Sequence, residues 1–417
     1  MLNASSDAPP LDIAPVAIST TSAAGNALDL QLSFVNNLAS SNVHAYMTGL
    51  VDGNLVLLQA GGGWFYPPNP AAGEVHQAIT ADIAIPLGSQ GSTTNIALPG
   101  NYVSSGRIYF ADGTLDFFVN PGDTGPSLVQ PSSVNPSDSS ADVNWGFIEL
   151  TTSAADGIFA DITYVDFVGL PLGLTLESAD GNTQTAPGVP AGGIADVCSG
   201  LQAQATKDGQ PWDRLCMDDA DGNLLRVLSP EGYLAYNSSA FSDYFTEYVD
   251  QVWAHYAQNV LTIDTQAAAG VVNCTVKPAA FGSGTTSAEL TCTGDNRGYA
   301  QPSAADIFGC DSGPFYIAAT DNAVHVAVVP RLCAALNRAT LLQEGGDQQP
   351  SEDPSGYYTT SPNNWYSAIV HENELDHRGY AFAYDDVGPN GGQDQAGAVS
   401  DGNPTKLTVT VGGPSSA

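Results

Sequence analysis

The sequence contains few basic residues. Ten Lys and Arg stand against 44 Asp and Glu, which gives a net charge of −34 at pH 7. Nucleic acids and anionic membranes would repel such a chain, so neither is an expected partner. A neutral partner such as a polysaccharide is compatible with this charge, and the scarcity of Lys suits an extracellular or acidic setting. Halophilic adaptation would give the same excess of acid, but the cysteines and sequons described below favour secretion.

Long apolar runs and common cofactor motifs are also missing. Hydrophobic residues make up 43% of the 417 positions, but no apolar run approaches the length of a membrane span. There is no G-x-S-x-G elbow, no P-loop and no G-x-G-x-x-G after a strand, so serine-hydrolase, nucleotide and dinucleotide chemistry have no support. We therefore expect a soluble globular protein of one to three domains that uses no cofactor.

The cysteines indicate disulfides. All six lie between residues 198 and 333, and their even number without C-x-x-C spacing favours three bridges formed in an oxidising compartment. Six cysteines allow 15 pairings. Short loops favour the pairs Cys198–Cys216, Cys274–Cys292 and Cys310–Cys333.

Two further features bear on secretion. Sequons for N-glycosylation occur at Asn3, Asn237 and Asn273. The first ten residues have neither a basic region nor an apolar region of the kind found in secretory signals. We interpret Met1 as an addition to a mature, processed chain of a secreted protein.

The order of patterns predicts a β domain with an insertion. Residues 14–190 consist of short alternating segments separated by Gly, Pro, Asn and Asp, which is typical of an antiparallel sandwich or barrel. After a Gly-rich turn at 181–193, the pattern predicts helices at 238–258, 329–342 and 363–374, and paired strands at 270–278 and 287–294. Strand patterns return at 380–387 and 406–413. We predict a β-barrel domain at 1–190, rejoined by 365–417, and a mixed α/β domain with three disulfides at 191–364.

The strongest candidate site lies between residues 144 and 177. Two strand-like runs, 145–151 and 158–172, flank a turn-rich stretch and predict a hairpin. Two acids, Glu149 and Asp166, lie among apolar residues where a carboxylate is costly. Glycoside hydrolysis requires such a pair: one acid protonates the leaving oxygen, and the other activates water or attacks the sugar. The alternative is that both acids lie at solvated strand edges.

The spacing of these acids makes a further prediction. A simple hairpin turning at residues 155–156 would pair Glu149 with Ile162 and leave Asp166 about 13 Å further along the strand. An inverting glycosidase needs its carboxyl groups about 6.5–9.5 Å apart. A bulge, strong strand coiling or a different strand pairing is therefore expected here.

Five ordered blocks resemble the β-1,3-glucanases of glycoside hydrolase family 64: SGRIYF at 105–110, GPSLVQPSSVNPSD at 125–138, NWGFIELT at 144–151, YVDFVGLPLGL at 164–174 and RGYAFAYDDV at 378–387. The resemblance extends from about residue 39 to residue 387. It implies a thaumatin-like fold, in which a barrel and a mixed α/β domain face each other across a wide groove. It also implies an inverting mechanism, with Glu149 as general acid and Asp166 as general base. The sugar contacts of the family map to Thr151 and Thr163, and an aromatic contact falls near Phe159.

Several other residues are candidates for the groove, most of them with an alternative role. Trp64 and Tyr66, in the loop at 61–70, would stack on sugar rings or hold the loop on the barrel. Asp161 would line the groove, as would Tyr46 and Asp116, or it would face solvent beside Ile162. Asp385 and Asp386 would line the groove, make structural bonds or bind a cation, and we expect no metal.

The segment HENELDHRGY, which begins at His371, resembles a zinc motif only superficially. Its two histidines are six residues apart, whereas a zincin helix needs four. We therefore expect acidic and basic groups to pair at a helix end here.

Together these observations predict a secreted, monomeric endo-β-1,3-glucanase that acts on laminarin-type or curdlan-type glucan. One rival is a catalytically silent glucan-binding protein of thaumatin type, and another is a structural or antifungal cell-wall protein. Release of reducing sugar from curdlan would distinguish the enzyme from both.

Overall fold

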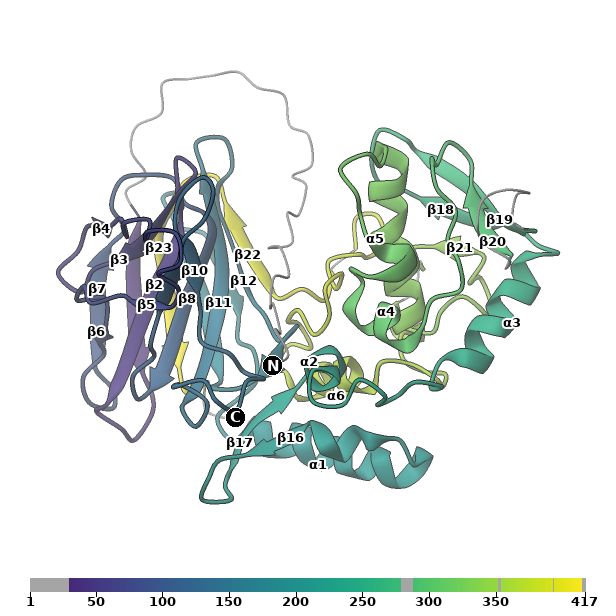
Figure 1. The fold of residues 1–417 in the computed structure, drawn as a ribbon. Coiled ribbons are helices and arrows are strands. Elements are labelled where there is room, and N and C mark those ends of the chain that lie inside the picture. The colour runs from purple at the N-terminus through teal and green to yellow at the C-terminus, as the bar shows by residue number, and fades with distance from the viewer. Residues whose placement is uncertain (1–29, 279–287, 352–353, 393, 415–417) are drawn as a thin grey trace.

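The structure is a computed structural model and describes residues 30–278, 288–351, 354–392 and 394–414. The sequon at Asn3 and the interpretation of Met1 fall outside these residues. Two lobes are visible in Figure 1: a β-rich lobe built from the first half and the end of the chain, and a mixed lobe built from the residues between them. This arrangement confirms the predicted β architecture with an inserted α/β part.

Two large sheets form the β-rich lobe. The larger sheet has the order β22 (Ala398–Asp401), β12 (Gly157–Ile162), β11 (Asn144–Ser153), β8 (Ser104–Asp112), β2 (Val43–Val51), β3 (Asn54–Leu58) and β4 (Trp64–Phe65), with β6 (Ile85–Pro86) paired to β2. The smaller sheet has the order β15 (Thr183–Ala186), β14 (Leu172–Ser178), β23 (Pro404–Val411), β1 (Gln31–Asn36) and β7 (Thr93–Ala97). The C-terminal strands β22 and β23 thus join sheets that the first strands began. Strand β23 matches the strand predicted at 406–413, whereas β22 was not predicted.

The core between these sheets follows from the alternation of each strand. Ile148 and Leu150 of β11 face inward with Phe110 of β8, and Leu32 and Phe34 of β1 face them from the other sheet. The rings of Phe34 and Phe110 meet edge to face at 5.1 Å. Each such side chain contributes about 1.5–3 kcal/mol when fully buried. The opposite residues of β11 and β8 therefore point away from this core.

The outer face of the larger sheet is partly covered. Its aromatic residues Tyr109, Trp145 and Phe147 form a second cluster with Phe117 and other residues. A small sheet of β10 (Ser127–Val129), β9 (Phe118–Asn120) and β5 (Gln77–Ala78) contributes to this cover, because Leu128 packs against the cluster. Of the polar residues on the same face, Arg107 and Glu149 stay partly exposed, whereas Thr48 and Asp161 are buried.

A further small sheet joins the two lobes. In it β13 (Phe167–Val168), which follows directly after Asp166, pairs with β17 (Leu224–Leu228), and β17 pairs with β16 (Cys216–Asp218). The short helix α2 (Pro230–Leu234) comes next, and Figure 1 shows it between the lobes. The backbone N–H of Ser229, the N-cap of α2, donates to the carbonyl of Asp166 at 2.9 Å. Asp166 is thereby held at the junction of the lobes.

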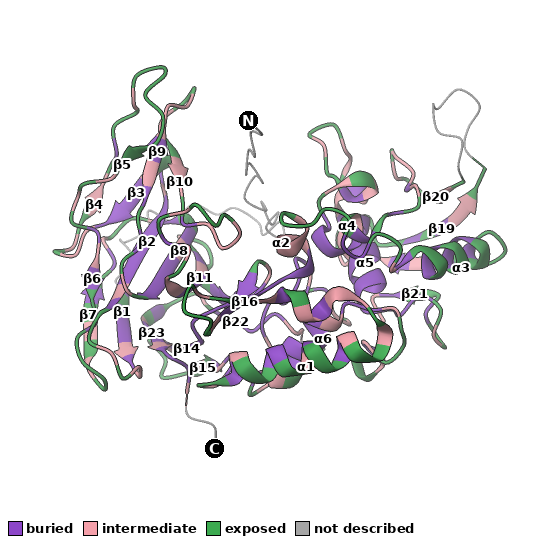
Figure 2. Cartoon of the chain, turned by 60° about the horizontal axis from the view of Figure 1, so that its bottom comes forward, coloured by how far each residue is buried: buried purple, intermediate pink, exposed green. Residues whose placement is uncertain are grey.

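The mixed lobe contains a four-stranded sheet and several helices. The sheet has the order β20 (Glu289–Cys292), β19 (Val271–Lys277), β18 (Leu261–Asp264) and β21 (Gln348–Gln349). The helices are α1 (Gly193–Asp208), α3 (Thr246–Tyr256), α4 (Ala304–Gly309), α5 (Ala323–Asn337) and α6 (Trp365–Asn373), with 3₁₀ turns at Pro211–Leu215, Gly313–Phe315 and Pro354–Gly356. Figure 2 shows buried residues along one side of α1 and α3 and exposed residues along the other.

The three predicted disulfides are confirmed. Cys198–Cys216 ties α1 to β16, Cys274–Cys292 links β19 to β20, and Cys310–Cys333 joins the end of α4 to α5. All three lie within residues 191–364. Each closes a loop of 18 or 23 residues, for which about 2–4 kcal/mol of stabilisation is typical.

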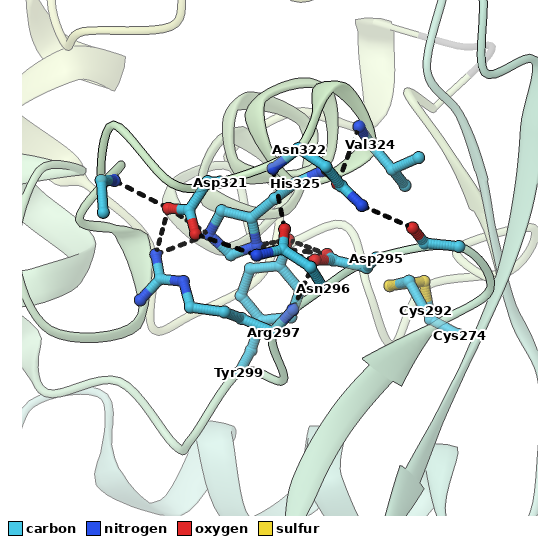
Figure 3. Close-up of polar contacts among 12 residues, drawn as sticks. Cys274, Cys292, Asp295, Asn296, Arg297, Tyr299, Asp321, Asn322, Val324 and His325 are labelled. Atoms are coloured by element: carbon cyan, nitrogen blue, oxygen red, sulfur yellow. Dashed lines mark hydrogen bonds and ion pairs between the residues drawn. A yellow bond between two sulfur atoms is a disulfide. The ribbon is translucent and has the colours of Figure 1, made fainter.

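A buried polar network organises the mixed lobe around His325. Figure 3 shows the His325 ring between Asp295, which follows β20, and Asp321, which precedes α5. His325 Nδ1 lies 3.0 Å from Asp295, and Arg297 contacts Asp321 at 2.8 Å. These partners hold the pKa values of both aspartates below their ordinary range despite burial, which opposes the charged form. The network fastens the loop after β20 to the start of α5.

Several local predictions were wrong. Residues 380–387 form turns rather than a strand, because the Asp385 carboxylate accepts hydrogen bonds from the N–H groups of Ala381 and Phe382 and replaces strand pairing. Strand β15 lies within the predicted Gly-rich turn. Helix α5 begins six residues before the predicted start, where Asn322 caps it through bonds from Val324 and His325.

Other predictions stay open. Within the described residues, no helix combines the length and apolar character that a membrane span requires. The domain boundaries at 190 and 365 and the groove between the lobes stay predictions. Helix α6 lies on the C-terminal side of the predicted boundary at 365, but it packs against α1, which lies within the predicted α/β domain.

Candidate functional site

A polar row crosses the outer face of the larger sheet. Thr48 of β2 pairs with Arg107 of β8, Arg107 with Glu149 of β11, and Glu149 with Asp161 of β12. Directly paired residues point to the same side of an antiparallel sheet. The register corrects the prediction that Glu149 pairs with Ile162. The turn holds three residues, 154–156, and closes at Gly157 with a φ of 69°, so the pairing shifts by one.

Arg107 holds the carboxylate of Glu149. Its Nε donates to Glu149 Oε1 at 2.8 Å, and its guanidinium lies 4.8 Å from the centre of the Phe147 ring. The two side chains are 31% and 39% exposed, so a ligand can reach Glu149. Burial opposes the charge of Arg107, but Tyr109, Glu149 and Asp166 raise its pKa above the ordinary value. Arg107 thus interacts electrostatically with both predicted catalytic acids.

Asp166 reaches this region by a change of strand pairing. Strand β12 ends at Ile162, and after a bend containing Asp166 the chain enters β13, which pairs with β17 instead. Asp166 therefore does not lie on a straight continuation of β12, and a different strand pairing is the one of the three expected alternatives that is seen here. The separation of the two carboxyl groups stays a prediction. The Asp166 side chain is exposed, as expected of a group that must reach water.

Asp161 is the buried acid of the polar row. It is only 5% exposed, and its Oδ1 has no hydrogen-bond partner among the described residues. Burial, followed by the charges of Glu149 and Asp386, raises its pKa well above the ordinary value, whereas Arg107 lowers it. The sequence left open whether Asp161 lines a groove or faces solvent; the structure shows that it is not solvent-facing.

The segment at 378–387 brings a further carboxylate to Asp161. Tyr380 is fastened to the end of β12, because its N–H donates to the Ile162 carbonyl at 3.0 Å and its carbonyl accepts from Tyr164 at 2.6 Å. Asp386 follows on this segment and is open to solvent. The surrounding protein still desolvates it enough to raise its pKa to about 6.

The predicted sugar-binding residues fall into two groups. Thr151 and Phe159 pair with each other in the row next to Glu149 and Asp161, and Phe159 is 38% exposed. Thr163 lies on the other side of that row, lining a small crevice with Phe147, and its hydroxyl accepts from the Val165 N–H. These three residues surround the acids of the polar row.

Trp64 and Tyr66 lie elsewhere. Trp64 is on β4, four strands from β11, which corresponds to about 19 Å. Its ring packs against the core between the sheets, as in the loop-holding interpretation. Tyr66 is 52% exposed. Neither is brought to Glu149.

Glu231 was missed by the sequence analysis. It lies on α2, and burial, with smaller effects of Asp311 and Asp166, raises its pKa to about 8. A Cβ added at Gly309 would lie 2.8 Å from Glu231 and 2.9 Å from Asp311, so both carboxyls face this glycine. The sequence analysis also gave Arg107 no role. Basic residues are rare in this chain, so an arginine within the SGRIYF block could have been recognised as a candidate site residue.

The predicted pairing of acidic and basic groups around His371 is present. His371 lies 2.9 Å from Glu374 and 3.3 Å from Asp385, and Asp385 also contacts Arg338 at 3.2 Å. Among the residues that the structure describes, no group of three or more His, Cys, Asp or Glu side chains is arranged to hold a metal ion. Carboxyl groups such as those of the polar row and Asp166 are of the residue type that transfers protons in general acid–base catalysis.

The chain is similar to several known proteins. The β-1,3-glucanases of glycoside hydrolase family 64 match the sequence over residues 28–411. A glucan endo-1,3-beta-glucosidase of Cellulosimicrobium cellulans is 28% identical over 391 residues, and one of Arthrobacter sp. strain YCWD3 is 27% identical over 389 residues. Each alignment covers 92% of this chain but 65% of the relative, so the chain spans about two thirds of their length.

Solved structures are also similar. A laminaripentaose-producing β-1,3-glucanase in complex with laminaritetraose has a TM-score of 0.76 at 26% identity, covering 93% of this chain and 98% of that one. A β-1,3-glucanase domain from Clostridium beijerinckii shares the fold, with a TM-score of 0.69 at 19% identity over 94% of this chain and 100% of its own. Since the family matches nearly the whole sequence, the chain belongs to glycoside hydrolase family 64.

Proposed function

We propose that this protein is an endo-β-1,3-glucanase that hydrolyses its substrate with inversion, using Glu149 as general acid and Asp166 as general base. The observation that carries the proposal is the position of Arg107, which bonds Glu149 and interacts electrostatically with Asp166. Family membership over residues 28–411 supports the same activity.

In this mechanism the two acids act on opposite sides of one sugar. Asp166, which is exposed to solvent, takes a proton from a water molecule as that water attacks the anomeric carbon. Glu149 gives its proton to the glycosidic oxygen, which leaves with the other part of the chain. Hydrolysis is complete without a covalent intermediate, and the configuration at the anomeric carbon is inverted.

The substrate is a β-1,3-glucan. Phe159 would stack on a sugar ring beside Glu149, and the hydroxyls of Thr151 and Thr163 would bond sugar hydroxyls on either side of the acid. The similar glucanase crystallised with laminaritetraose supports this substrate class. Trp64 and Tyr66 would contact only a glucan chain that extends about 19 Å across the sheet.

The protein would work outside the cell as a monomer. Three disulfides favour an oxidising compartment. Asn237 and Asn273 are exposed and open to glycosylation. The barrel would comprise residues 1–190 and 365–417, and the α/β domain residues 191–364, with the glucan between them.

Reducing-sugar release from curdlan and laminarin tests the proposal. The wild type should cleave both and leave cellulose and chitin intact. Hydrogen-bond donors of the site that are placed for the hydroxyls of a coiled β-1,3-glucan would be left unpaired by an extended β-1,4-linked chain. Glu149→Gln and Asp166→Asn should each lower turnover at least about a hundredfold. Matched exposed controls, Glu247→Gln on α3 and Asp196→Asn on α1, should retain wild-type turnover.

Two outcomes would contradict this proposal. More than about a tenth of wild-type activity in either site variant would remove that residue from its role. Binding of curdlan by the wild type without any release of sugar would favour the glucan-binding protein instead.

A further inference from the structure

The carboxyl of Asp161 lies directly across the strand pair from the proposed acid. We propose that Asp161 and Glu149 share one proton, so that Asp161 acts as a positioning residue that keeps Glu149 able to donate beside the Arg107 cation. This inference rests on the proposed function and adds a residue to its proton-donating side.

The pairing of β11 and β12 supports direct contact. Glu149 and Asp161 are opposite one another on the same face, which places their Cβ atoms about 5 Å apart. Two carboxyl groups at that separation can form a hydrogen bond when one carries the proton. Arg107 approaches Glu149 from the opposite strand, β8, and bonds its Oε1. Glu149 is therefore flanked by a cation on one side and a carboxyl on the other.

The burial of Asp161 indicates where the proton is needed. The side chain is 95% buried, and Oδ1 has no partner among the described residues. An ionised carboxylate in that position would be costly, because burial removes the water that stabilises its charge. With the proton between the two groups, the pair carries one negative charge, which Arg107 neutralises.

The two carboxylates near Asp161 act in the same direction as burial, whereas the Arg107 cation opposes them. Arg107 faces it from β8 and Glu149 from β11, while Asp386 and Tyr380 face it from the segment at 378–387. Burial first, and then the negative charges of Glu149 and Asp386, raise the pKa of Asp161, which agrees with a retained proton.

This arrangement addresses a difficulty for the proposed acid. Arg107 alone would stabilise ionised Glu149, which cannot protonate a leaving oxygen. A neighbouring carboxyl opposes a second ionisation, so a pair of carboxyls holds its last proton to a higher pH than a single carboxyl would. During hydrolysis Glu149 passes this proton to the leaving oxygen and Asp166 receives one from water. The pair regains its proton from solvent, and Asp166 releases one, so no proton is consumed.

The pH profile of kcat/KM on a soluble laminari-oligosaccharide tests the sharing. In Asp161→Asn the second carboxyl is absent, so Glu149 should ionise earlier and the alkaline limb should move down by at least one pH unit. Activity on the acidic side should stay within about threefold. Asp156→Asn, in the exposed turn of the same hairpin, is the matched control and should leave both limbs in place. An unmoved alkaline limb in Asp161→Asn, or an equal loss at all pH values, would overturn the inference.

A second measurement needs no activity. Infrared titration of protonated carboxyl groups, in the wild type and in Glu149→Gln, follows the proton on Asp161 directly. Sharing predicts that Asp161 loses its proton at least one pH unit lower in Glu149→Gln, because the repelling charge is gone. An unchanged titration would refute the sharing. The expected shift in a protein that cleaves no β-1,3-glucan would instead refute the proposed function and leave the shared proton standing.

Discussion

His371 connects helix α6 to the segment that carries Asp386, and its titration should be visible in the stability of the protein. The ring is buried between Glu374, at 2.9 Å, and Asp385, at 3.3 Å. Burial opposes the charged ring, but the two carboxylates outweigh it and raise the pKa of His371 to about 10. The folded protein therefore keeps a proton that the unfolded chain loses near pH 6.5.

The sign and size of the effect follow from this difference. Below about pH 6.5 the ring is charged in both states, and the contribution to stability is complete. As the pH rises from there towards 10, only the folded state holds the proton, so the free energy of unfolding falls. The slope approaches 1.4 kcal/mol per pH unit, which amounts to about 2–3 kcal/mol between pH 7 and pH 9.

Urea unfolding followed by tryptophan fluorescence measures this loss. We expect wild type to be more stable than His371→Gln at pH 7, and the gap to narrow by about 2–3 kcal/mol at pH 9. His255→Gln, at an exposed position of α3, should show no such narrowing. A gap between wild type and His371→Gln that stays constant from pH 7 to pH 9 would refute the reasoning.

Three further predictions concern the site and the mixed lobe. Arg107→Gln should lower kcat about tenfold or more and move the alkaline limb of the pH profile upward, because Glu149 loses the hydrogen bond that orients it and the neighbouring guanidinium cation. The control is Arg214→Gln, at an exposed position. An unchanged pH profile in Arg107→Gln would contradict the proposed effect of Arg107 on Glu149. Phe159→Ala should raise KM for laminari-oligosaccharides severalfold with a smaller effect on kcat, because a stacking contact stabilises the bound substrate and the transition state alike. An unchanged KM would show that Phe159 does not contact the sugar. Reduction of the disulfides should unfold the mixed lobe while the strand signal in circular dichroism persists, because each bridge contributes about 2–4 kcal/mol there; simultaneous loss of the strand signal would contradict this.

Local patterns in the sequence were sufficient for much of the fold. The alternation around Ile148 and Leu150 predicted a strand with one buried face, and short loop closure predicted all three disulfides. The paired strands at β19 and β20 were predicted for the same reason, since each depends on neighbours close in sequence.

Long-range contacts were not predictable in this way. The register between Glu149 and Asp161 depends on the positive φ of Gly157, which a residue count across the turn cannot supply. The approach of Asp386 to Asp161 joins positions 225 residues apart. The strand-like pattern of 380–387 did not indicate that the Asp385 side chain would accept a hydrogen bond from the nearby backbone N–H of Ala381. The burial of Asp161 follows from these contacts, and so the sequence left its role open.

The anomeric configuration of the first product tests the central claim most directly. Proton NMR of a laminari-oligosaccharide, recorded before mutarotation, resolves the α and β forms of each new reducing end. Single displacement by water, with Glu149 as acid and Asp166 as base, predicts that the α form appears first. Initial release of the β form would mean that a covalent intermediate had formed and would contradict the assignment of Asp166 as a base.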